Sequence, residues 1–141
     1  MHIRLARLDD LVPIAQVYHA SISELCSNDY EQEVIQAWLE ASNPDARKRY
    51  IESGCLWVVE SFSRTQFDLT SNHSLTENGT LVQGHQTNEL AGFMVTVPGE
   101  LISLFIHPDF SGLGVGKKLA EIGIQFAQKG HKVIRLEATL T

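Results

Sequence analysis

Three glycines, Gly112, Gly114 and Gly116, alternate with apolar residues late in the chain, and two lysines, Lys117 and Lys118, follow them. Glycines lack the Cβ atoms that would keep a ligand away from the backbone. If a helix begins here, its first turn presents unpaired N–H groups and the positive end of the helix dipole. The spacing therefore predicts an anion-binding loop that suits a phosphate or pyrophosphate, with a lysine adding positive charge.

Two common phosphate-binding loops fit this stretch poorly. A Walker loop needs four residues between its glycines and a Ser or Thr after the lysine, whereas three residues separate Gly112 from Gly116 and the residue after Lys117 is Lys118. A dinucleotide fingerprint reads G-x-G-x-x-G near the start of a βαβ unit, but this pattern is G-x-G-x-G. The remaining alternative is a tight strand-to-helix connection, which does not need three glycines in five residues because each costs helix entropy.

The residues on either side predict the elements that position the loop. Leu101–His107 is an apolar run stopped by Pro108, which is typical of a buried strand. After the loop, apolar residues recur at helical spacing, and Gly130 is placed to end that helix. The residues of this apolar stripe are Val115, Leu119, Ile122 and Phe126.

The sequence FIHPDF at 105–110, followed by SGLGVG at 111–116, resembles motif A of the GNAT superfamily of acyl-CoA N-acyltransferases. The family pattern is a strand ending in a hydrophobic residue, His or Asp, and Pro, then [QR]-x-x-G-x-[GA] and a helix. Ser111 replaces the usual Gln or Arg, and Leu113 replaces a frequent Arg or Lys. The resemblance covers the chain except for a polar insertion at about 62–89. Within the superfamily, the chain more specifically resembles small bacterial GNAT proteins with unassigned substrates.

The resemblance implies acetyl-CoA as the co-substrate. In that family the pantetheine arm pairs with exposed backbone of the fourth strand, and the pyrophosphate lies on the glycine loop. The N–H group of Ile106 would then donate to the developing oxyanion. The implied cofactor-binding residues are Leu104, Phe105, Ile106, Gly112, Leu113, Gly114, Val115, Gly116 and Lys117.

Two carboxylates are candidates for the base that deprotonates an attacking amine. Glu137 matches a fifth-strand position where some GNAT members carry a catalytic Glu, and Glu100 begins the fourth strand. Each has the alternative interpretation of an ordinary carboxylate paired with a neighbour such as Arg135. The acceptor is expected near Ser23–Tyr30 and Trp38.

The predicted fold is α/β (α+β), a GNAT-like mixed and largely antiparallel sheet flanked by helices, in the order β-α-α-β-β-β-α-β. Asp9 or Asp10 is expected to cap the first helix, and Asn43 with Pro44 restarts a helix after the second. The predicted strands are His2–Arg7, Cys55–Ser61, Leu90–Val97, Leu101–His107 and Lys132–Ala138, and the predicted helices are 9–26, Glu31–Ala41, Asn43–Ser53 and the helix after the glycine loop.

Two polar stretches have less specific interpretations. The insertion at about 62–89 is rich in Ser, Thr, Asn, Gln and Gly, so it is either disordered or an added hairpin around Asn78-Gly79. His73 and His85 within it are expected to be polar loop residues, and no metal site is predicted. The basic cluster Arg47–Arg49 is expected to form a solvated helix face.

The length, net charge and apolar runs of the sequence limit the classes of function that it can have. With 141 residues, the whole chain, 1–141, is predicted to be a single domain. A net charge of −6 argues against nucleic acid as a partner. No apolar run approaches ~20 residues, so no membrane span is predicted, and the N-terminus lacks a secretion signal. The expected location is therefore cytoplasmic, with Cys26 and Cys55 as free thiols.

The sequence thus favours an acetyl-CoA-dependent N-acetyltransferase acting on a primary amine of a small molecule or peptide. The resembled proteins usually continue past the fifth strand, whereas this sequence ends at Thr141. An unpaired fifth strand would invite a second chain, so a homodimer through this edge is expected. The alternative function is a catalytically degenerate GNAT domain that serves as a CoA-binding or protein-interaction module.

Overall fold

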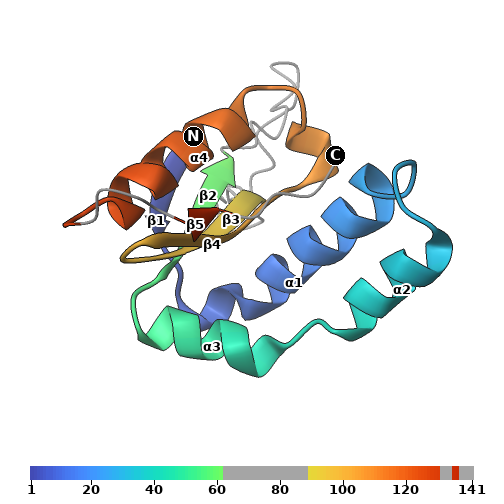
Figure 1. Cartoon of the computed structure of the whole chain (residues 1–141), viewed down its shortest axis with the longest axis horizontal. Coiled ribbons are helices and arrows are strands. Elements are labelled where there is room, and N and C mark those ends of the chain that lie inside the picture. The colour runs from blue at the N-terminus through green and yellow to red at the C-terminus, as the bar shows by residue number, and fades with distance from the viewer. Residues whose placement is uncertain (62–88, 131–134, 137–141) are drawn as a thin grey trace, which may run out of the picture.

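The described part of the chain forms a five-stranded sheet in the order β1-β2-β3-β4-β5 (Figure 1). The computed structural model describes residues 1–61, 89–130 and 135–136. Neighbouring strands from β1 to β4 are antiparallel, and β5 runs parallel to β4. This arrangement confirms the predicted mixed, largely antiparallel sheet. The strands are β1 (His2–Leu5), β2 (Leu56–Ser61), β3 (Glu89–Val97), β4 (Glu100–Ile106) and β5 (Arg135–Leu136).

Helices cover both faces of the sheet. Figure 1 shows α4 on one face and α1, α2 and α3 on the other. The α-helices are α1 (Leu11–Ala20), α2 (Gln32–Glu40), α3 (Pro44–Glu52) and α4 (Val115–Ala127), and the short turns are the 3-10 helices η1 (Leu8–Asp10) and η3 (Pro108–Phe110) and the π-helical turn η2 (Ser21–Leu25). Among the described helices, none combines the length and apolar character needed to cross a bilayer.

Some predictions concern residues outside the described ranges. Of the predicted insertion at 62–89, only Glu89 is described, and it is the first residue of β3. Of the predicted fifth strand, Arg135–Leu136 is described as β5. Glu137 lies outside the described residues. Cys26 and Cys55 are both free thiols, as predicted.

The core has two halves because side chains alternate along each strand. On the α4 face, Met94 and Leu101 pack against Val115 and Leu119. On the α1 face, Phe93 packs in a cluster that includes Ile14 and Val17 of α1. The same alternation assigns Leu104 and Ile106 to the α4 half and Phe105 to the α1 half.

The start of α3 follows its predicted signals. The Asn43 side chain accepts a hydrogen bond from the Ala46 N–H at 3.1 Å, and Pro44 is the first helical residue. The expected solvated face is wrong for Arg47, however. Its guanidinium carbon lies 4.6 Å from the centre of the Tyr18 ring, because Arg47 is on the side of α3 that faces α1, while Lys48 and Arg49 are exposed.

The first helical segment begins differently from the prediction. Neither Asp9 nor Asp10 caps α1 with its side chain. The Asp10 carboxylate turns back instead, and accepts hydrogen bonds from the Arg7 N–H at 2.7 Å and from the Arg4 guanidinium at 2.8 and 2.9 Å. Arg4 Nε also donates to Glu60 on β2 at 2.8 Å. A charged network therefore ties β1, η1 and β2 together.

Close backbone contact requires glycine at position 92 of β3. A Cβ on Gly92 would lie 2.7 Å from Ile106 Cδ1 and 2.7 Å from the Phe105 carbonyl oxygen. We expect Gly92→Ala to lower the free energy of unfolding by about 1–3 kcal/mol through overpacking, measured by urea denaturation. The matched control is Gly116→Ala, whose Cβ would lie 3.4 Å from the same Ile106 side chain. Equal stability of the two variants would contradict the expectation.

Candidate active site

The glycine loop connects η3 to α4 and depends on left-handed backbone. Gly112 has φ of 76° and Gly114, the N-cap of α4, has φ of 79°. L-residues with side chains rarely adopt this region. A Cβ at either glycine would meet nothing within 4 Å. The space beside this backbone is therefore open, and a ligand can approach it closely.

The first turn of α4 presents N–H groups to that open space. The Lys118 N–H donates to the Gly114 carbonyl at 3.1 Å. The N–H groups of Val115, Gly116 and Lys117 come before this bond, and helices leave such groups without an intrahelical acceptor. The Lys117 and Lys118 side chains are exposed. N–H donors, the helix dipole and two ammonium groups together suit a phosphate or pyrophosphate.

Successive residues of β4 direct their backbone N–H and C=O groups alternately toward β3 and toward the side of β5. The His107 N–H donates to the Ala91 carbonyl at 2.8 Å, so the backbone of His107 points toward β3. Because backbone groups of a strand alternate in direction, those of Ile106 and Leu104 point away from β3, toward the side of β5. By the same alternation, the backbone groups of Phe105 point toward β3, as those of His107 do. Of the predicted pantetheine-binding residues, Leu104 and Ile106 thus share one backbone edge, and Phe105 does not.

The Phe105 side chain joins β4 to the helices on the α1 face. Its ring stacks on Phe93 with 5.3 Å between centroids, and meets the Tyr18 ring edge-on at 5.0 Å. The Tyr18 hydroxyl donates to the Trp38 carbonyl at 2.8 Å. Burial raises the pKa of Tyr18 above its ordinary value of 10.0, so its hydroxyl is a proton donor at neutral pH. Trp38 was expected near the acceptor, and this contact connects it to β4 through two aromatic rings.

Of the two candidate bases, Glu100 and Glu137, the structure describes only Glu100. Glu100 begins β4, and its Oε1 is 4.0 Å from Arg135 Nε on β5. Ile106 is at the opposite end of the same strand, which puts it ~20 Å away from Glu100. The structure therefore does not bring Glu100 to the glycine loop or to the Ile106 N–H. Glu137 is outside the described residues, so its role stays a prediction.

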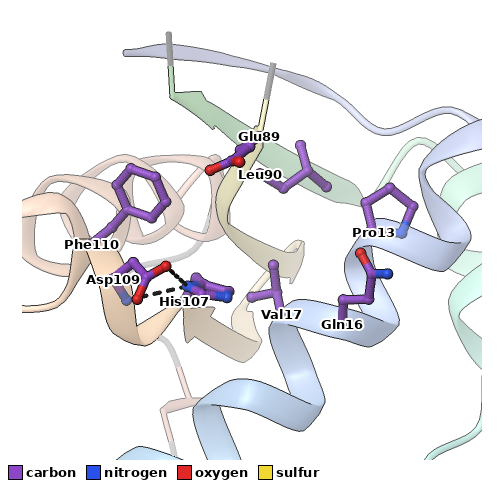
Figure 2. A pocket seen from close by; sticks show the side chains of 8 residues that line it. All are labelled: Pro13, Gln16, Val17, Glu89, Leu90, His107, Asp109 and Phe110. Atoms are coloured by element: carbon purple, nitrogen blue, oxygen red, sulfur yellow. Dashed lines mark hydrogen bonds and ion pairs between the residues drawn. The ribbon is translucent and has the colours of Figure 1, made fainter. Parts of the chain in front are cut away.

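A pocket of about 330 Å³ lies where α1, the start of β3 and η3 meet (Figure 2). His107 Nδ1 accepts a hydrogen bond from the Asp109 N–H at 3.2 Å, so the neutral ring carries its proton on Nε2. The pocket is lined by Pro13, Gln16, Val17, Glu89, Leu90, His107, Asp109 and Phe110. The sequence contained no signal for it, because its walls come from three segments far apart in the chain.

This pocket is separate from the backbone edge of Leu104 and Ile106. Glu89 and Leu90 in its wall belong to β3, whereas the edge faces the side of β5. The pocket wall includes neither Leu104 nor Ile106. We assign the glycine loop and the edge, rather than the pocket, to the candidate active site.

Known proteins resemble this chain in sequence and in fold. Residues 35–141 match the family model described as acetyltransferase (GNAT) family. No curated protein sequence matches the chain. Among solved structures, a GCN5-related N-acetyltransferase from Rhodopseudomonas palustris is 23% identical with a TM-score of 0.60, and the match covers 89% of this chain and 64% of that one.

Two further solved structures share the fold. PaiA N-acetyltransferase from Thermoplasma acidophilum, solved in complex with coenzyme A, is 17% identical with a TM-score of 0.61, covering 92% of this chain and 72% of that one. Apo YjaB from Escherichia coli is 20% identical with a TM-score of 0.52, covering 89% and 65%. The chain thus spans about two thirds of the length of these structures. Because the family model matches most of the sequence, this chain belongs to the acetyltransferase (GNAT) family.

Proposed function

We propose that this protein is an acetyl-CoA-dependent N-acetyltransferase that acetylates a primary amine of a small molecule or peptide. The observation that carries the proposal is the glycine loop at the N-terminus of α4, next to a β4 edge with outward backbone groups. Family membership supports it. The bound coenzyme A in the Thermoplasma acidophilum enzyme, which has a similar fold, supports it further.

Backbone groups do most of the proposed binding. The N–H groups of Gly112–Lys117 would hold the pyrophosphate, and the Lys117 side chain would add positive charge. The backbone of Leu104 and Ile106 would pair with the pantetheine arm. The Ile106 N–H would donate to the carbonyl oxygen of the acetyl group, where negative charge develops. These roles do not depend on the identity of Ser111 or Leu113, the two departures from the family pattern.

The transfer itself is a substitution at the carbonyl carbon. The lone pair of the acceptor nitrogen forms the new C–N bond, the C–S bond of the thioester breaks, and its electron pair leaves with sulfur. The amine nitrogen loses one proton, and the CoA thiolate takes one up. A base near the amine assists the first of these proton transfers. We propose Glu137 for this role on sequence grounds.

An acetyl-transfer assay tests the proposal. The protein is incubated with acetyl-CoA and a panel of amines and peptides, and acetylated products are identified by mass spectrometry beside release of free CoA thiol. We expect one acceptor class to yield product in proportion to thiol. A Glu137→Gln variant should bind acetyl-CoA normally and transfer more slowly. Binding of acetyl-CoA without transfer to any acceptor would favour the degenerate CoA-binding alternative.

A further inference from the structure

Arg47 is a buried cation with no anionic partner among the residues that the structure describes. Its exposed fraction is 8%, yet none of the hydrogen bonds or ion pairs among the described residues involves its guanidinium. The contrast with Arg4 is direct, because Arg4 has both Asp10 and Glu60 as partners. Removing a charge from water without pairing it is costly, so proteins rarely do so without a use for the charge.

The surroundings of Arg47 are aromatic. Its guanidinium carbon lies 4.6 Å from the centre of the Tyr18 ring, a cation–π contact. Burial lowers the pKa of Arg47, and its interaction with Tyr18 offsets this only in part. The guanidinium stays charged at neutral pH, since an arginine starts from a very high pKa. An external anion would therefore gain a charged partner in partly desolvated surroundings.

The guanidinium nitrogens of Arg47 keep some contact with solvent. Among the described residues, every fully buried side-chain nitrogen or oxygen has a hydrogen-bond partner. The Arg47 nitrogens have no such partner, so they must retain contact with solvent. Because only 8% of the residue is exposed, this contact is small, and it is where the guanidinium, a planar fork of N–H donors, can meet a ligand. This fork matches a carboxylate in a bidentate geometry.

The position of Arg47 relates it to the proposed active site. A single aromatic ring, that of Tyr18, separates its guanidinium from Phe105. Phe105 stands on β4 between Leu104 and Ile106, whose backbone edge we assign to acetyl-CoA. We propose that Arg47 binds a carboxylate of the acceptor, so that the acceptor is an amino acid or a similar amino carboxylate rather than a simple amine. This inference rests on the proposed function, because it describes the acceptor of that reaction.

Calorimetric binding to matched pairs of probes tests the inference without turnover. Each pair is an amino acid and its decarboxylated amine: phenylalanine and 2-phenylethylamine, leucine and isopentylamine, lysine and cadaverine. Titrations use the CoA-saturated protein. For at least one pair, we expect the amino acid to bind at least about tenfold more tightly, the scale of a hydrogen bond to a charged group.

Three variants separate recognition from packing. Arg47→Met retains a long apolar stem and should abolish the preference for the amino acid while leaving the amine unchanged. Arg47→Lys keeps the charge without the fork and should retain part of the preference. Arg49→Met, on the exposed side of the same helix, is the matched control and should behave like the wild type.

The outcomes are distinguishable. No preference in any of the three pairs, a preference that survives in Arg47→Met, or an equal loss for amino acid and amine would each overturn the assignment. If Arg47→Met is too unstable to measure, the Arg47→Lys titration decides: a reduced preference would support the assignment, and an undiminished preference would overturn it. A preference that depends on Arg47 without acetylated product would support the carboxylate site and contradict the acetyltransferase function instead.

Discussion

Gly114→Glu is expected to weaken acetyl-CoA binding at least about 100-fold, because two effects act on the same loop. The new side chain would have to adopt φ of 79°, which is unfavourable for any residue with a Cβ. It would also bring a carboxylate to the N–H groups proposed for the pyrophosphate, where like charges repel. Calorimetric titration of the variant with acetyl-CoA measures the effect.

The matched control is Gly54→Glu. Gly54 follows α3 and has φ of 70°, and a Cβ at this position would meet nothing within 4 Å, so the backbone cost is comparable. We expect this variant to lose stability to a similar degree and to bind acetyl-CoA as the wild type does. A similar loss of affinity in both variants would show that Gly114 acts only through folding.

Asp10→Ala is expected to lower the free energy of unfolding by about 3 kcal/mol, the lower end of the range for breaking a buried ion pair. The substitution removes both hydrogen bonds between Asp10 and Arg4, whose side chain is only 18% exposed. Arg4 keeps Glu60, which limits the loss. Urea denaturation measures it. Asp9→Ala removes an exposed neighbouring carboxylate and should change stability little.

The effect of Asp10 should depend on pH in a defined direction. Burial alone would raise the pKa of Asp10, but hydrogen bonds from Arg4 and the Arg7 N–H outweigh it and hold the pKa below the ordinary value of 3.8. The folded state therefore binds this proton less readily than the unfolded state. The stabilisation is present above the ordinary pKa and is lost as the pH falls through the lowered one.

A pH series of denaturation experiments checks this sign. The stability difference between wild type and Asp10→Ala should be constant near neutral pH. It should shrink as the pH falls below about 4. A difference that grows in acid, or that is already absent near neutral pH, would contradict the described network.

Local signals made the loop and its flanking elements predictable. The apolar run Leu101–His107 indicated a strand, and the spacing of Gly112, Gly114 and Gly116 indicated a turn with open backbone before a helix; the structure contains all three elements. The cap of α3 by Asn43 was predictable for the same reason, since donor and acceptor are three residues apart. Such features depend on short stretches of sequence, which is why spacing alone indicates them.

The remaining features depend on contacts between distant segments. Arg47 looked like part of a solvated basic cluster, and only the packing of α3 against α1 buries it over Tyr18. Asp10 looked like a helix cap, but a partner on β1, Arg4, draws its carboxylate away. Glu100 was a reasonable candidate base by residue type, yet the length of β4 separates it from the loop. No pattern within one segment reports such distances.

Calorimetric titration of this 141-residue chain with acetyl-CoA, using ATP as the control ligand, tests the proposed site most directly. Both ligands carry adenosine and phosphates, but only acetyl-CoA has a pantetheine arm to pair with the backbone of Leu104 and Ile106. We predict binding of acetyl-CoA with a Kd of about micromolar and much weaker binding of ATP. No binding of acetyl-CoA, or equal binding of the two ligands, would contradict the proposed site.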